Sequence, residues 1–222
     1  MTIIQRLKLI ILFIFVTFSF FDSALASNFS GKWFTVEMII FSHFQPRYLD
    51  SEQWPNITPV VLASDKSIQL NQPSEQIKLL PAVDYKLDGL VKKISKNSSY
   101  KVLAHVLWQQ KIMQPNLAIP IHFFAKGVLN NASLHNLKYD PNQVWDINGT
   151  ITLSVVKYLN ASFNLYFSED ASYLSKIATN HYFDSAQGSV YFNFKQSRRM
   201  KSKEINYLDS PNYGVLIYIT RG

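Results

Sequence analysis

Alternation of apolar and more polar residues near the C-terminus is the feature that most restricts how this chain folds. Val190, Phe192 and Phe194 occupy every second position, and residues 215–219 repeat the pattern. A period of two is typical of a strand with one buried face. Residues 209–212 read Asp-Ser-Pro-Asn, which favours a turn. We therefore expect two strands that flank a cationic turn, and then a tight turn into a last strand.

The segment Trp33–Phe41 is the strongest strand pattern in the first half of the chain. Apolar residues fill both of its faces, as in a central strand that is covered on both sides. Glu37 is the exception, because a buried carboxylate needs a partner. We expect Glu37 to pair with an Arg or Lys or to lie at the sheet margin. A contact between Glu37 and a ligand is the alternative.

The remaining periodic segments are β-rich and contain one helical pattern. Further strands are predicted at 100–110 and 119–126, and a hairpin at 145–169. Residues 80–94 carry apolar residues at helical spacing, which predicts an amphipathic helix of roughly four turns. Residues 43–79 are predicted to form a long loop. The expected class is α+β: a single domain with a curved, mostly antiparallel sheet of about eight strands, open or partly closed into a barrel, and one main helix packed on it.

The first residues have the organisation of an export signal. Arg6 and Lys8 precede an apolar run at 9–21, which is shorter than the about 20 residues that span a bilayer. Small residues then predict cleavage between Ala26 and Ser27. We expect a signal peptide at 1–26 and a binding domain at 27–222, with no membrane span after cleavage. An uncleaved anchor is the alternative.

Composition limits the chemistry that the chain supports. The net charge of +7 favours an anionic partner. Nucleic acid is not expected as that partner, because the export signal directs the chain away from it. The chain has no Cys, and its five His show no metal-ligand spacing. Nothing selects a catalytic pair among the acidic candidates Glu37, Glu52, Asp84, Glu169 and Glu204. We therefore expect a binding protein rather than an enzyme, with no cofactor, metal or catalytic residue.

The cationic turn is the first candidate for binding. Arg198, Arg199, Lys201 and Lys203 lie close together and near Tyr207. Guanidinium groups bind carboxylates in a bidentate manner, and we expect aromatic faces to suit sugar rings. Since neighbouring strand residues point to opposite faces, we expect one Arg to face solvent or ligand and the other to pair with a carboxylate such as that of Glu37. A solvated hairpin turn is the alternative.

Three blocks of sequence resemble the CsiV family. The first is the run at 198–209 with Pro211 and Gly214-Val215-Leu216. The second is Trp33–Phe41 followed by Glu52 and Trp54-Pro55. The third is the spaced set Tyr100, Val102-Leu103, His105, Trp108 and Gln110. The chain has Asn206 and Ser210 at two places where the family often has His, so any role of those imidazoles in ligand binding is absent here.

The resemblance implies a periplasmic, non-enzymatic peptidoglycan-binding protein of a Gram-negative bacterium. Such proteins support cell-wall synthesis through an outer-membrane lipoprotein that activates a class A penicillin-binding protein. A cell-envelope peptidoglycan hydrolase and a secreted host-directed protein are the alternatives. The candidate ligand-binding residues are Arg198, Arg199, Lys201, Lys203, Glu204, Tyr207, Trp33, Glu37, Trp54 and Trp108.

Overall fold

The computed structural model describes residues 29–51, 67–72, 74–81, 84–179, 181–183 and 188–222. The predicted signal peptide, its cleavage site at Ala26 and Ser27, Glu52 and Trp54 lie outside these residues. The elements are β1 (Lys32–Ser42), α2 (Pro46–Ser51), β2 (Ile68–Gln69), β3 (Ile77–Leu79), α3 (Asp88–Ser95), β4 (Lys101–Ile112), β5 (Ile121–Ala125), β6 (Leu129–Asn130), α4 (Asn131–Leu134), β7 (Ile147–Val155), β8 (Leu159–Asp170), α5 (Ala171–Ile177), β9 (Ser189–Met200), β10 (Ile205–Asp209) and β11 (Tyr213–Arg221).

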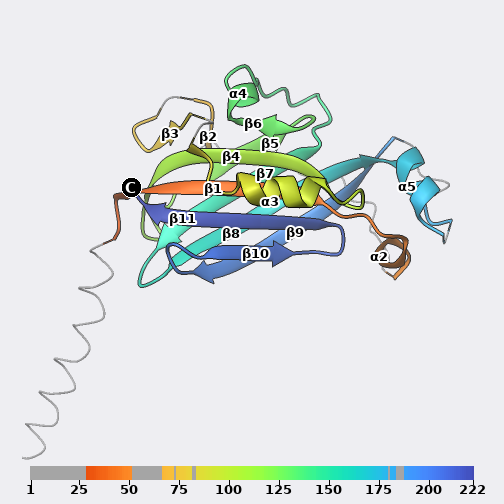
Figure 1. The fold of residues 1–222 in the computed structure, drawn as a ribbon. Coiled ribbons are helices and arrows are strands. Elements are labelled where there is room, and N and C mark those ends of the chain that lie inside the picture. The colour runs from red at the N-terminus through yellow and green to blue at the C-terminus, as the bar shows by residue number, and fades with distance from the viewer. Residues whose placement is uncertain (1–28, 52–66, 73, 82–83, 180, 184–187) are drawn as a thin grey trace, which may run out of the picture.

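The strands form two sheets (Figure 1). The first sheet has the order β10-β11-β1-β4-β3, with β6 beside β4, and the second has the order β2-β5-β7-β8-β9. Most neighbours are antiparallel, and the β4–β6 and β2–β5 pairs are parallel. The mostly antiparallel class is confirmed. The single sheet of about eight strands and the partly closed barrel are wrong, since the described strands divide between two open sheets.

One apolar core lies between the two sheets. It joins side chains of the first sheet, such as Val36 and Trp108, to side chains of the second, such as Phe163 and Leu165. The inward-facing side chains come from alternate positions of each strand, as the period of two requires. β1 is central in its sheet, as predicted, with β11 on one side and β4 on the other.

α3 lies over the first sheet (Figure 1), and a smaller apolar cluster fills the space between them. Ile39 and Phe41 of β1 pack with Leu87 and with partly buried residues of α3. α3 begins at Asp88 rather than near residue 80, so the predicted four-turn helix is too long. Three shorter helices (α2, α4 and α5) accompany it among the described residues, where one main helix was expected.

The two strands that flank the cationic turn do not pair with each other. β9 pairs with β8 over its whole length, whereas β10 pairs with β11. The chain therefore crosses from the second sheet to the first at residues 201–204, and the expected hairpin at this place is wrong. The β7–β8 hairpin and the tight turn from β10 into β11 are confirmed.

Candidate ligand-binding sites

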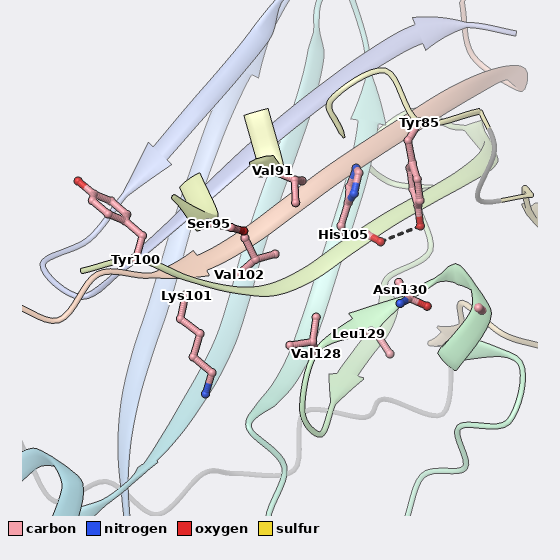
Figure 2. A pocket seen from close by; sticks show the side chains of 11 residues that line it. Tyr85, Val91, Ser95, Tyr100, Lys101, Val102, His105, Val128, Leu129 and Asn130 are labelled. Atoms are coloured by element: carbon pink, nitrogen blue, oxygen red, sulfur yellow. Dashed lines mark hydrogen bonds between the residues drawn. The ribbon is translucent and has the colours of Figure 1, made fainter. Parts of the chain in front are cut away.

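A cleft of about 580 Å³ opens between α3, β4 and β6 (Figure 2). Val91 and Ser95 of α3 form one wall, and Val128 and Leu129 form the opposite wall. His105 of β4 lies at its floor, where the ring of Tyr85 stacks on the imidazole at a centroid distance of 3.9 Å. The walls are mainly apolar, so a polar ligand in the cleft would have to bind to the polar groups at its floor.

These floor groups are occupied with one another. Glu37, which is 1% exposed, accepts hydrogen bonds from the backbone amides of Lys86 (2.9 Å) and Leu87 (2.8 Å). Its Oε1 also lies 2.8 Å from Nε2 of His105. The hydroxyl oxygen of Tyr85 lies 2.8 Å from the carbonyl oxygen of His105 and 3.0 Å from Asn131 Oδ1, so these two acceptors share its single proton. Burial is the main cause that raises the pKa of Tyr85.

Glu37 therefore fastens the start of α3 to the central strand. Leu87 is the residue before α3 and has no side-chain cap of its own, and the carboxylate of Glu37 binds the amides at this point instead. Within the described residues the partner of Glu37 is His105 with two amides, so the expected Arg or Lys partner is wrong. Removing one partner of a buried hydrogen bond leaves the other group unsatisfied, which costs about 1–3 kcal/mol.

A second candidate site lies at the end of the sandwich where β1 begins and β11 ends. Antiparallel pairing brings together strand ends that are far apart in sequence: Trp33 lies opposite Lys111, and Phe34 opposite Arg221. In the other sheet Asn160 lies opposite Arg199. The cationic turn is at this same end, and we name it the cationic end.

An open pocket of about 370 Å³ lies between the two sheets at the cationic end, and we name it the mouth pocket. Its floor is apolar and its rim is cationic. The floor is formed by Phe29, Phe34, Val155, Leu159 and Met200. The rim is formed by Lys157, Tyr158, Lys201, Ser202, Lys203 and Arg221. An apolar floor with several cations above it suits a ligand with both a ring face and carboxylates.

The turn that carries Lys201 and Lys203 is held in one conformation. The amide of Lys203 donates to the carbonyl of Ile219 at 2.8 Å, and the hydroxyl of Ser202 donates to the same oxygen at 3.2 Å. Lys203 has a φ of 68°, in the left-handed region that a non-glycine residue rarely adopts. Such strain persists only where surrounding contacts enforce it, and it gathers at binding sites.

Glu204 is the acidic neighbour of these cations. Its Oε1 lies 3.9 Å from Nζ of Lys201, and both side chains are exposed. A solvent-exposed pair of this kind contributes about 0–1 kcal/mol. Glu204 therefore offsets part of the positive charge of the turn, whereas Lys203 has no carboxylate partner among the described residues.

A comparison with protein families identifies the chain from nearly its whole length. Residues 7–222 match the family model described as "Peptidoglycan-binding protein, CsiV". The chain belongs to the CsiV family. Neither the curated proteins nor the solved structures give a match to it.

In this CsiV-family chain, both arginines of the predicted site are exposed. The guanidinium of Arg199 lies 4.7 Å from the ring centroid of Tyr158, which lines the mouth pocket. Neither Arg198 nor Arg199 forms an ion pair with a carboxylate in the part of the chain that the structure describes. The expectation that one of them pairs with a carboxylate such as Glu37 is therefore wrong, because Glu37 lies beneath α3.

The other predicted residues are dispersed. Trp108 is fully buried in the core and offers no surface to a polymer. Tyr207 is on the outer face of β10, where its hydroxyl donates to Asp209 Oδ1 at 2.5 Å. Trp33 is partly exposed at the cationic end and lines a further pocket of about 380 Å³, which we name the Trp33 pocket. The structure thus brings Lys201, Lys203 and Trp33 to one end of the molecule.

Most residues of the mouth pocket were not among the predicted ligand-binding residues, and its further cationic and aromatic side chains are Phe29, Phe34, Lys157, Tyr158 and Arg221. Lys157 and Tyr158 form the tip of the predicted β7–β8 hairpin, and Arg221 ends the last predicted strand. Their residue types are a signal that the sequence contains, since each is a cation or an aromatic residue in a turn or near the end of a strand. That these residues lie close together could not be predicted from the sequence, because it depends on how two separate sheets stack.

The described residues contain no cluster of His, Cys, Asp or Glu that could hold a metal ion. In the same part of the chain, no helix is both long and apolar enough to cross a membrane. The carboxylates considered for catalysis occupy different elements: Glu37 is in β1, Glu169 in β8 and Glu204 in the turn before β10.

Proposed function

We propose that the protein binds peptidoglycan through the mouth pocket at its cationic end. The observation that supports this most is the combination of an apolar floor with a rim of Lys157, Lys201, Lys203 and Arg221. Peptidoglycan offers the matching chemistry, because its stem peptides carry carboxylates along a glycan of sugar rings. The family description names the same polymer.

Different side chains of the pocket bind different parts of the ligand. Lys and Arg at the rim donate charge-assisted hydrogen bonds to stem-peptide carboxylates. The apolar floor and the ring of Tyr158 pack against the less polar face of a sugar. Arg199, which lies over Tyr158, holds this ring in place and adds positive charge beside it.

We further propose that the protein acts without catalysis as an accessory factor in cell-wall synthesis. Export by the predicted signal peptide would place the domain from Ser27 onward in the periplasm, where the polymer lies. The cationic end occupies only part of the surface, so a second protein has room to bind the same molecule. An outer-membrane lipoprotein that activates a class A penicillin-binding protein is the partner that we propose.

Co-sedimentation of the domain 27–222 with purified, insoluble sacculi tests the binding. We expect retention that falls as salt rises from low to physiological ionic strength, because exposed charges are screened. Absence of the protein from the pellet at low salt would refute the proposed function. Zymography on peptidoglycan tests the non-enzymatic role, and a clearing band would overturn it. N-terminal sequencing of the mature protein tests the cleavage before Ser27.

A further inference from the structure

The Trp33 pocket adjoins the mouth pocket at a shared residue. The Trp33 pocket is lined by Lys32, Trp33, Lys78, Gln109, Arg221 and Gly222, and Arg221 also lines the mouth pocket. We propose that the two pockets are successive subsites for one continuous segment of an anionic glycan–peptide polymer, with Arg221 contacting the segment between them. The proposal rests on the proposed function, and it adds that the ligand is a chain of repeated units.

The register of β1 explains how the pockets are arranged. Trp33 and Phe34 are consecutive strand residues, so their side chains point to opposite faces of the first sheet. Phe34 faces the core and forms part of the mouth pocket, whereas Trp33 lies on the outer face. A ligand in both pockets must therefore cross the end of the sheet.

Arg221 lies at this crossing. It is the Cα partner of Phe34 at the end of β11, and it is exposed. Its guanidinium lies 5.8 Å from the ring centroid of Phe29 in the mouth pocket. Arg221 lines both pockets, and its guanidinium, a planar group with five donors, suits a carboxylate between two subsites.

The Trp33 pocket repeats the chemistry of the mouth pocket. Nζ of Lys78 lies 4.8 Å, and that of Lys111 5.4 Å, from the ring centroid of Trp33. An aromatic ring is thus again combined with ammonium groups. Among the described residues, no acidic side chain lines either pocket.

The sizes of the pockets favour part of one repeating unit in each, such as a sugar ring or a stretch of stem peptide. Their volumes of about 370 and 380 Å³ lie near the lower limit for small-ligand sites. A polymer with a second unit linked to the first binds the second pocket at high effective concentration, so its affinity exceeds that of a single unit. A single unit gains nothing from the second pocket.

Isothermal titration with two defined probes tests this arrangement. One probe is a single disaccharide–peptide, and the other is an uncrosslinked glycan chain of several such units. For the domain 27–222 we expect the chain to bind roughly tenfold or more tightly than the single unit when both affinities are expressed per disaccharide–peptide unit. Trp33→Ala and Tyr158→Ala, which each damage one pocket, and Arg221→Ala, which damages both, should each bring this ratio of affinities toward one.

Lys93→Ala, which removes an exposed cation on α3, is the control and should keep the ratio of the unaltered protein. If the protein binds sacculi but Trp33→Ala keeps the full ratio, the two-subsite proposal is overturned and the proposed function stands. Equal affinity of the unaltered protein for both probes would also overturn it. If the protein binds neither probe nor sacculi, both proposals fail together.

Discussion

The two ends of the sandwich differ in what their charged groups contact. At the end opposite the cationic end, four carboxylates have partners within the protein. Asp209 accepts a hydrogen bond from Tyr207 and lies 3.2 Å from His43 Nε2, and Asp170 caps α5 through the amides of Ser172 and Tyr173. We name this the acidic end.

Two further carboxylates of the acidic end follow the same rule. Asp146 accepts from Nζ of Lys126 at 2.7 Å and from the amide of Gly127 at 2.8 Å. Asp50 accepts from the amide of Thr179 at 2.9 Å. These carboxylates cap helices, join loops and neutralise a neighbouring cation, so they stabilise the fold.

At the cationic end the charges are directed elsewhere. Arg199 and Arg221 lie over aromatic rings, and Lys203 projects from a strained turn with no carboxylate partner among the described residues. Of the cations that line the mouth pocket, only Lys201 has an acidic neighbour within 4 Å in that part of the chain. Partners within the protein thus satisfy these charged groups of the acidic end, whereas most cations of the cationic end are available to an external anion.

Neutralising the cations at the rim of the mouth pocket should give the largest loss of binding to sacculi. In the variant with Lys157, Lys201, Lys203 and Arg221 all replaced by Gln, we expect retention on sacculi to fall by more than about tenfold. Four exposed contacts of about 0.5–1 kcal/mol each justify this magnitude. The matched control replaces Lys86, Lys92, Lys93 and Lys96 by Gln, for the same change in net charge. An equal loss in the control would show that total charge, not the cationic end, determines binding.

Lys203→Gly separates binding from stability at the cationic end. The charge is lost, so retention should fall about two- to fivefold. The left-handed conformation costs a non-glycine residue about 1–2 kcal/mol, and glycine brings an entropic cost of about 0.5–1 kcal/mol. The free energy of unfolding in urea should therefore stay the same or rise slightly. Lys203→Ala is the control, with a similar loss of retention and no gain in stability, and a lower stability of the glycine variant would contradict the strain.

Glu169 and Asp170, which are neighbours at the acidic end, should contribute to stability with opposite signs at pH 7. Burial raises the pKa of Glu169 above its ordinary value of 4.5, so the fold loses stability as the pH rises from that value through the raised folded-state pKa. Glu169→Gln should raise the melting temperature at pH 7 and leave it unchanged at pH 4. The hydroxyl of Ser172 and the amides that Asp170 caps lower the pKa of that carboxyl.

The contribution of Asp170 is therefore present above the ordinary value of 3.8 and is lost as the pH falls through the lower folded-state pKa. Asp170→Asn should lower the melting temperature at pH 7. Thermal melts of both variants at the two pH values compare the signs directly. Shifts of the same sign at pH 7 would contradict the different environments of the two carboxylates.

Much of the fold was predictable from periodicity, and the pairing of its strands was not. The alternation at Val190, Phe192 and Phe194 correctly indicated a strand with one buried face, and both apolar faces of Trp33–Phe41 correctly indicated a central strand. Alternation defines a face but no partner. β9 continues to Met200 because it pairs with the long edge of β8. The sequence of residues 196–209 alone does not indicate that this edge is available for pairing.

The candidate site was predictable to the same degree. A cluster of cations in a turn is visible in sequence, so Lys201 and Lys203 were found. Arg221 and Lys157 join them only because β11 ends, and β7 turns, at the same end of the sandwich. The prediction that Trp108 binds ligand is wrong for a related reason, because Trp108 is fully buried. The sequence of a strand does not show which of its faces is buried until the stacking of the sheets is known.

The smallest expected effect concerns the two arginines before the turn. Both are exposed, and neither pairs with a carboxylate among the described residues, so neither supports the fold through an ion pair. Arg198→Ala should leave the free energy of unfolding within about 0.5 kcal/mol. Arg199→Ala loses the contact with Tyr158 and should cost about 0.5–1 kcal/mol, with a small loss of retention because this ring lines the mouth pocket. Urea unfolding and co-sedimentation of the two single variants measure both quantities. A loss of several kcal/mol in either variant would mean that the cationic end, like the acidic end, has its charges bound within the protein.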